Sequence, residues 1–458
     1  MAQHRKLIRG GTVVSVDSAI GDLPSGDVLV EGDRIAAVAP RIDAADAEVV
    51  DATGMIVMPG LVDTHRHVWQ SALRQIAADW TLEEYFARVI GAFSPVFTPE
   101  DVHVGTHFGA VEALDSGITT IFDWSHIMNT PEHADAAVTA LQQAGIRAVF
   151  GHGMPTNDPA WYFNSDRRHP DDARRLASRY FSSPDQLLTL ALSVRGPELA
   201  TIGATADDLA LARELGVRAS MHVGLGLMGQ QRAVTQMHDR ALLADDLIFL
   251  HCNTCTDEEL KYIAGSGGHA SVSARIEMLM GHGVPATGRL LEAGIRPALS
   301  VDVVCGVTGS MFDEMRGVLE AERGRRHRLR LDHGAEPAGP TPTTRDAIEF
   351  ATIEGARTLD LERRIGSLTP GKQADVILLN VAAAPFGMIN NVPAAIAFSD
   401  VRDVDTVLVA GQFRKRHGRL LDYDAAGVRA QAERSRDRLF AAAGLPDGTT
   451  PVKVSSDR

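Results

Sequence analysis

The stretch Pro59-Gly60-Leu61-Val62-Asp63-Thr64-His65-Arg66-His67 carries the strongest structural signal in the chain. It is an apolar run that ends in two histidines separated by one residue. If residues 61–67 form a β-strand, side chains alternate between its two faces, so His65 and His67 point to the same side. Two imidazoles that converge from one strand are half of a transition-metal site. The pattern becomes specific only if the rest of the chain supplies further ligands.

The composition is that of an ordinary globular protein. The chain has 458 residues, 45% hydrophobic and 23% charged, which is enough for one large domain and a smaller one. Its net charge is −14, and the one basic run, residues 323–330, is short. This balance argues against nucleic acid and anionic membranes as partners. We therefore expect a small-molecule substrate, and leave a homo-oligomer open.

Cysteine usage and the N-terminus indicate the compartment. Cys252, Cys255 and Cys305 are the three cysteines, too few for a disulfide framework, and they favour a reducing environment. Cys252 and Cys255 have C-x-x-C spacing, but no second pair completes a four-cysteine zinc site, and a redox role is the weaker interpretation. Residues 1–10 lack the apolar core of a secretory signal, and no apolar run reaches the length of a membrane span. We predict a cytoplasmic protein with no membrane segment.

The middle of the chain alternates short apolar runs with amphipathic stretches. Runs such as 119–123, 148–152 and 247–251 each precede a helical stretch, which predicts parallel βα units. Residues 56–364 have room for eight such units, so we predict an α/β fold with a (β/α)8 TIM-like barrel. A doubly wound open sheet is the alternative, but no G-x-G-x-x-G motif opens a helix after an early strand.

The two ends of the chain share a different texture. Residues 5–50 and 374–409 contain short strands and turns, including a hairpin signal at Glu31-Gly32-Asp33. We predict a small β-sandwich domain built from residues 1–55 and 365–425, which the barrel of residues 56–364 interrupts. Residues 426–458 are predicted as a C-terminal helix and tail.

Polar side chains stand at the ends of four predicted strands. His65 and His67 end the first, and His222, His251 and Asp302 each end a later apolar run. In a barrel the functional groups gather at the carboxyl ends of the strands, so we expect these five side chains at one mouth. A single histidine beside an apolar run is more often structural. Five such residues at strand ends are improbable by chance.

Together these motifs resemble the amidohydrolase superfamily, in its cytosine deaminase and triazine hydrolase-like branch. The resemblance rests on residues 58–67 followed by Gln70, on the ordered series His222, His251 and Asp302, and on the closing segment 366–376. It implies a hydrolase with one divalent metal ion, most often zinc, with iron or manganese as alternatives. By this resemblance the metal ligands are His65, His67, His222 and Asp302. His251 corresponds to the residue that hydrogen-bonds the metal-bound water or the developing oxyanion.

This set of residues suits hydrolysis. Three neutral imidazoles leave the ion strongly Lewis acidic and lower the pKa of its water to ~7. Asp302 can accept the proton of that water and pass it to a leaving nitrogen. We therefore predict that metal-bound hydroxide attacks a C–N bond of a small cyclic molecule, by deamination or by amide or amidine hydrolysis. A metal-dependent lyase or isomerase and a non-catalytic ligand-binding protein are the alternatives.

One position departs from the family pattern. Deaminases of this branch carry a glutamate three residues after the fifth-strand histidine, where this chain has Leu225. Leucine transfers no proton, so Glu277 or His282 is the candidate replacement. A salt bridge from Glu277 to Arg275 is the competing interpretation. We predict Asp302, His251 and Glu277 as catalytic residues.

Aromatic and polar residues near the strand ends are the candidate substrate contacts. Trp69 and Gln70 follow the two histidines, Trp124 and His126 follow the run 119–123, and Arg195 follows the run 188–194. Tryptophan and arginine beside a metal suit a flat, polar substrate, with an anionic one left open as an alternative.

Overall fold

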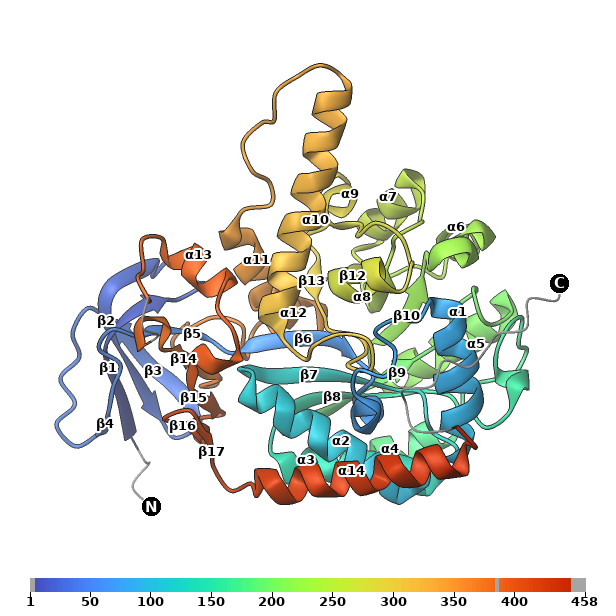
Figure 1. Cartoon of the computed structure of the whole chain (residues 1–458), viewed down its shortest axis with the longest axis horizontal. Helices are drawn as coiled ribbons and strands as arrows, with labels where there is room; N and C mark the ends of the chain where they lie inside the picture. The colour runs from blue at the N-terminus through green and yellow to red at the C-terminus, as the bar shows by residue number, and fades with distance from the viewer. Residues whose placement is uncertain (1–4, 384–386, 446–458) are drawn as a thin grey trace.

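A parallel sheet of eight strands forms the larger part of the protein (Figure 1). The computed structural model describes residues 5–383 and 387–445. Two backbone contacts join the first and last strands of the sheet. The Asp302 amide donates to the His65 carbonyl, and the His67 amide donates to the Asp302 carbonyl, both at 2.9 Å. These contacts close the sheet and confirm the predicted barrel. In chain order its strands are β6 (Leu61–Arg66), β7 (Ile118–Ser125), β8 (Arg147–His152), β9 (Leu188–Ser193), β10 (Ala219–Val223), β11 (Leu247–His251), β12 (His269–Val272) and β13 (Ala298–Leu299).

Helices follow the strands and cover the barrel from outside (Figure 1). Several begin at a capping box, in which a threonine and an acidic residue three positions later satisfy each other's backbone amides, as Thr98 and Asp101 do at α2. Gly145 ends α3 with a φ of 60°, a left-handed conformation that glycine adopts without steric cost. The helices are α1 (Leu82–Tyr85), α2 (Pro99–Asp115), α3 (Pro131–Ala144), α4 (Asp172–Tyr180), α5 (Ile202–Leu215), α6 (Ala233–Asp239), α7 (Asp257–Ser266), α8 (Ala274–Leu279), α9 (Thr287–Glu292), α10 (Met311–Asp332), α11 (Thr344–Phe350) and α12 (Ile353–Thr358).

A second sheet combines the two ends of the chain, which confirms the predicted small β domain. Its nine strands form one continuous mixed sheet, at the left of Figure 1. Strand β5 joins the two halves, because it pairs with β1 in parallel and with β14 in antiparallel orientation. Thus residues 56–59, which the predicted range assigned to the barrel, pair within the small sheet; the domain ranges otherwise stay a prediction. The strands are β1 (Arg5–Val14), β2 (Asp22–Glu31), β3 (Arg34–Ala39), β4 (Glu48–Asp51), β5 (Ile56–Pro59), β14 (Val376–Leu379), β15 (Val404–Val409), β16 (Gln412–Arg416) and β17 (Arg419–Leu420).

Two further helices and one projecting helix complete the described chain. The short helix α13 (Val392–Ala397) lies between β14 and β15, and α14 (Ala425–Ala442) runs beneath the barrel, where Arg438 and Ser435 bind the Asp101 carboxylate of α2 (Figure 1). The helix α10 extends beyond the body of the molecule, and its outer half carries the basic run 323–330. Among the described residues, no helix combines the length and apolar character that a membrane crossing requires. The predicted C-terminal tail falls mostly outside the described residues.

A buried ion pair joins the barrel to the small sheet. Arg147 of β8 donates from Nε and Nη2 to the two carboxylate oxygens of Asp375, at 2.8 and 2.9 Å, and both side chains are buried. Asp375 also accepts the Ala410 amide through its side chain and the Gly60 amide through its carbonyl. Gly60 is the single residue between β5 and β6. The pair therefore holds the strand that carries His65 against the small sheet.

Replacing Asp375 alone tests this joint. Asp375→Asn is expected to lower the free energy of unfolding by about 3–5 kcal/mol, because it leaves the Arg147 charge buried without a counter-charge. The double variant Arg147→Met/Asp375→Leu should recover part of that loss, since no buried charge remains. The measurement is the urea midpoint of each variant. Arg402→Ala removes a pair on the surface with Asp400 and should leave the midpoint unchanged. Equal midpoints for Asp375→Asn and the natural protein would contradict this account.

Candidate metal centre

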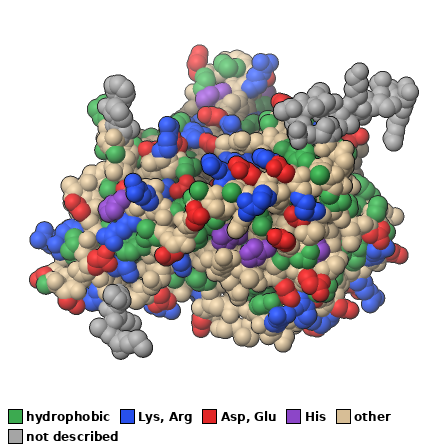
Figure 2. Space-filling model, turned by 60° about the horizontal axis from the view of Figure 1, so that its bottom comes forward, with side chains coloured by type: hydrophobic (Ala, Val, Ile, Leu, Met, Phe, Trp, Pro, Cys, Tyr) green, Lys and Arg blue, Asp and Glu red, His purple; other side chains and the backbone are tan. Residues whose placement is uncertain are grey.

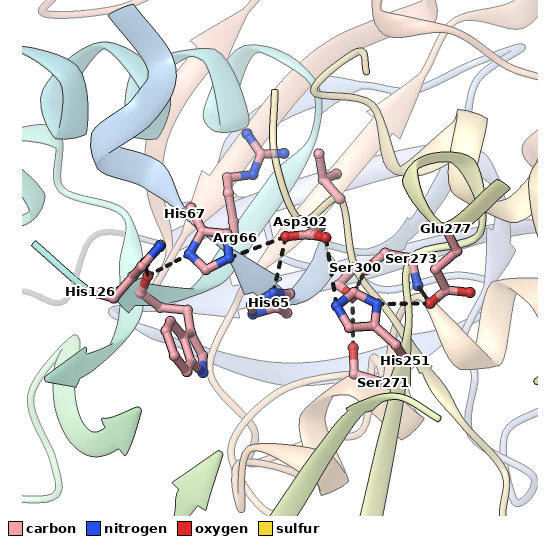
Figure 3. A network of polar contacts seen from close by, with 12 residues as sticks. His65, Arg66, His67, His126, His251, Ser271, Ser273, Glu277, Ser300 and Asp302 are labelled. Carbon is pink, nitrogen blue, oxygen red and sulfur yellow. Dashed lines mark hydrogen bonds and ion pairs between the residues drawn. The ribbon is translucent and has the colours of Figure 1, made fainter. Parts of the chain in front are cut away.

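The five side chains predicted at strand ends meet at one mouth of the barrel. Asp302 lies in the middle of the group, between His65 and His67 on one side and His251 on the other (Figure 3). Its Oδ1 is 3.1 Å from His65 Nε2 and 3.3 Å from His67 Nε2, and its Oδ2 is 3.6 Å from His251 Nε2. The His222 ring lies 4.9 Å from that of His65, between centroids. The convergence of His65 and His67 from one strand agrees with the predicted alternation.

The ligand atoms are close enough to share an ion. They form overlapping groups of three, and within each group the nitrogen and oxygen atoms lie within 4.8 Å of one another. One group holds His65, His67 and Asp302, and a second holds His65, His222 and His251. A third contains His251, His282 and Asp302. The structure therefore brings all four predicted ligands together and adds His282 at the edge of the site.

The protonation states of these groups suit a divalent cation. Burial lowers the pKa of His65 to about 3 and that of His222 well below its ordinary value. Burial raises the pKa of Asp302, but His65, His67 and His251 outweigh it, so the pKa of this carboxyl lies well below its usual range. Neutral imidazoles and an ionised carboxylate are the forms that bind metals. The buried Nε2 atoms of His65 and His251 also lack any well-aligned hydrogen-bond partner. The residues present fit a metal ion.

Hydrogen bonds behind the ligands fix their orientation. His67 donates from Nδ1 to the Trp124 carbonyl at 2.9 Å, which leaves the Nε2 lone pair facing the centre. Below the centre a chain of hydroxyls links three strands, because Thr64 contacts Ser271 at 2.7 Å and Ser271 contacts Ser300 at 2.7 Å. These hydroxyls tie the strand that carries His65 to the segments before Asp302.

Two residues of the group adopt a strained backbone. His251 has a φ of 72° and Asp302 a φ of 66°, in the left-handed region that costs non-glycine residues about 1–3 kcal/mol each. Such strain persists only where the surroundings impose it, and it gathers at functional sites. Here it turns both side chains from the strand ends toward the barrel axis.

Glu277 lies behind His251, on the side away from Asp302 (Figure 3). His251 donates from Nδ1 to Glu277 Oε1 at 3.0 Å, and the Ser273 amide donates to the same oxygen at 2.8 Å. Asn253 donates to Oε2 at 3.0 Å. Burial lowers the pKa of His251, but Glu277 and Asp302 outweigh it and the pKa is raised. Glu277 therefore reaches the site only through His251, and no salt bridge to Arg275 is formed.

Trp124 and His126 line the pocket above the centre, as predicted. Three other residues that were predicted as substrate contacts do not line this pocket. Trp69 is buried against Phe97, and Gln70 stands one layer back, where its Nε2 donates to the Tyr85 hydroxyl at 2.6 Å. Arg195 was predicted as a substrate contact, but its guanidinium donates to Ser165 at 2.8 Å, to the Arg167 carbonyl and to Asp208 at 3.2 Å. The loop after β9 thus directs Arg195 into the protein and away from the pocket.

A buried glutamate, Glu198, lies beside Leu225 and was not among the predicted site residues. Glu198 Oε1 accepts the Gly224 amide at 2.5 Å, and Oε2 accepts the Leu225 amide at 3.4 Å. Burial raises the pKa of Glu198 to about 7. Its place shortly after β9, at the same end of the barrel as the histidines, was the signal available in the sequence. Glu198 holds the loop at the position of the expected glutamate, while the Leu225 side chain lines the pocket.

Comparisons with known proteins show that this chain is similar to deaminases over most of its length. Two curated relatives are a 5-methylthioadenosine/S-adenosylhomocysteine deaminase of Symbiobacterium thermophilum and a 5'-deoxyadenosine deaminase of Methanothermobacter thermautotrophicus. The first is 31% identical, with 89% of this chain and 93% of the relative covered. The second is 26% identical, with 87% and 91% covered.

Solved structures share the fold. A zinc-bound adenosine deaminase from Xanthomonas campestris superimposes with a TM-score of 0.82 at 24% identity, covering 95% of this chain and 98% of its own. A zinc-bound atrazine chlorohydrolase from Arthrobacter aurescens gives 0.83 at 20% identity, covering 94% and 100%. The family model for the amidohydrolase family matches residues 56–414. Since this match includes the whole barrel and its strand-end ligands, the chain belongs to the amidohydrolase family.

Proposed function

We propose that this protein is a metal-dependent hydrolase that uses one divalent ion, zinc in the first place, to cleave a C–N bond of a small molecule with release of ammonia or an amine. The observation that carries the proposal is the convergence of His65, His67, His222 and Asp302 from three separate parts of the barrel. The deaminase activity named for the 31% identical relative supports the C–N bond as the target.

Each of these residues has a distinct part in the proposal. His65, His67, His222 and Asp302 would hold the ion, which when bound activates water as a nucleophile at neutral pH. The free Oδ2 of Asp302, 3.6 Å from His251 Nε2, accepts the proton of the attacking water and delivers it to the leaving nitrogen. His251 faces the same space and donates to the oxygen that develops charge on the substrate.

Glu277 is proposed as a positioning residue and not as a proton donor. A carboxylate at His251 Nδ1 fixes the ring orientation so that Nε2 faces Asp302. Burial lowers the pKa of His251, but Glu277 and Asp302 outweigh it, and the doubly protonated ring donates from Nε2 as well as from Nδ1. This replaces our prediction of Glu277 as a group that acts directly on the substrate, because its three hydrogen bonds face away from the pocket.

The partners and the cellular compartment of the protein are proposed from its surface charges and its cysteines. Acidic and basic side chains are interspersed on the face that Figure 2 shows, with no continuous basic stripe on it. This agrees with a substrate other than nucleic acid. Cys252, Cys255 and Cys305 are buried free thiols, which supports the reducing cytoplasm as the compartment.

Metal removal and ligand variants test the proposed centre. The purified protein should contain about one zinc, iron or manganese ion per chain by mass spectrometry, and a chelator should abolish ammonia release until metal is restored. His65→Asn and His222→Asn should each lose most of the metal. His238→Asn, at an exposed histidine outside the site, should keep it. Full metal content and activity in His65→Asn would rule out the centre.

Glu277→Gln tests the positioning role. The amide can still accept from His251 but lacks the charge, so we expect kcat to fall about 10- to 100-fold with metal content and KM little changed. Glu314→Gln is the matched control. Glu314 is also buried, and burial raises its pKa well above the ordinary value. Its hydrogen bond comes from the Arg275 amide and not from His251, so the same substitution there leaves the His251 ring untouched. A Glu277→Gln enzyme that keeps full kcat over the whole pH profile would contradict the role.

A further inference from the structure

The wall of the pocket above the metal centre is apolar. Leu82, Phe86, Met154, Leu199, Leu225 and Met280 line it, together with the rings of Tyr85, Trp124 and Tyr162. They come from β7 and from the segments that follow several other strands, so the apolar lining surrounds the space above the metal-ligand residues. Leu225 extends this lining down toward the centre, because Glu198 holds its loop from behind.

Besides the histidines and Asp302, the described lining holds no charged side chain that would pair with a charged substrate. Within residues 5–383 and 387–445, no lysine or arginine lines this pocket, and Asp302 is its one carboxylate. Arg195, the guanidinium predicted for this purpose, is bound to Ser165, the Arg167 carbonyl and Asp208. A carboxylate, phosphate or ammonium on the substrate would lose its hydration here, and the wall offers it no lysine, arginine or free carboxylate as a counter-charge.

A few polar atoms in the wall lack partners. The Tyr162 hydroxyl, the Trp124 indole nitrogen and both ring nitrogens of His282 are buried and make no hydrogen bond within the described chain. Tyr162 and Trp124 offer donors, and the neutral His282 ring offers one donor and one acceptor, so a bound ligand gains by pairing with them. An amino-substituted heterocycle carries ring nitrogens that accept and an amino group that donates, and it satisfies these groups without bringing a charge.

We propose that the substrate is uncharged and mostly apolar: an amino-substituted heterocycle whose other substituents are alkyl or aryl groups, with no carboxylate, phosphate or ammonium. The inference rests on the proposed hydrolase function, and it decides against the anionic alternative that Arg195 left open. It also sets this chain apart from a relative whose name includes S-adenosylhomocysteine, since that molecule ends in a charged amino acid group.

Three adenine derivatives of equal length test this specificity. They carry a pentyl, a carboxybutyl or an aminobutyl group on the same ring nitrogen, so they differ in charge and little in size. The zinc-loaded protein should bind the pentyl compound at least about 10-fold more tightly than either charged compound, because only the charged groups lose hydration without meeting a counter-charge. Calorimetry measures the dissociation constants, and ammonia release measures turnover separately.

A variant with a charge in the wall provides the converse test. Leu82 is half-buried on α1 at the pocket, so Leu82→Arg should fold and retain metal while shifting the preference toward the carboxybutyl compound by about 10-fold. Leu227→Arg, at an exposed leucine outside this lining, should leave the preference unchanged.

The outcomes separate the two proposals. A pentyl preference in binding without metal-dependent ammonia release would overturn the hydrolase function and keep the pocket chemistry. Equal or tighter binding of a charged compound, or no measurable binding of the pentyl compound, would overturn the proposed substrate class even if the protein releases ammonia from another substrate.

Discussion

Asp302 both closes the barrel through its backbone and holds the histidine group together through its carboxylate. Its amide and carbonyl make the hydrogen bonds to His65 and His67 that close the barrel between the first and last strands. Its carboxylate lies among the histidine rings at the centre. The hydrogen bonds that close the sheet therefore also bring the metal-ligand residues together. A barrel with another strand register would keep these residues apart. The left-handed φ of Asp302 is the local cost of serving both purposes.

The sequence predicted those parts of the site that the strands themselves position. His65, His67, His222, His251 and Asp302 stand at or just beyond strand ends, and the architecture of a parallel barrel brings such ends together whatever the loops do. The family, the barrel and the small domain from both chain ends were predictable for the same reason, since periodicity and motif order determine them. The hydrolase class that followed from them agrees with the relatives.

The sequence did not predict the positions of side chains whose direction depends on loop conformation. Arg195 and Trp124 both follow apolar runs, yet one is directed into the protein and the other into the pocket, and nothing in the local pattern separates them. Glu198 was missed because its partners, the amides of Gly224 and Leu225, are distant in the sequence. The polarity of the pocket follows from many such side-chain directions together, so it could not be inferred from single residues such as Arg195.

The pairing of β5 with β14 has a consequence for biosynthesis. The first five strands of the small sheet leave the ribosome early, but their partners β14 to β17 follow only after more than three hundred further residues. Until then β5 presents an open, apolar edge of the kind that recruits other strands. The growing chain therefore presents this edge until the barrel residues between β5 and β14 have been synthesised, an exposure that the finished fold no longer shows.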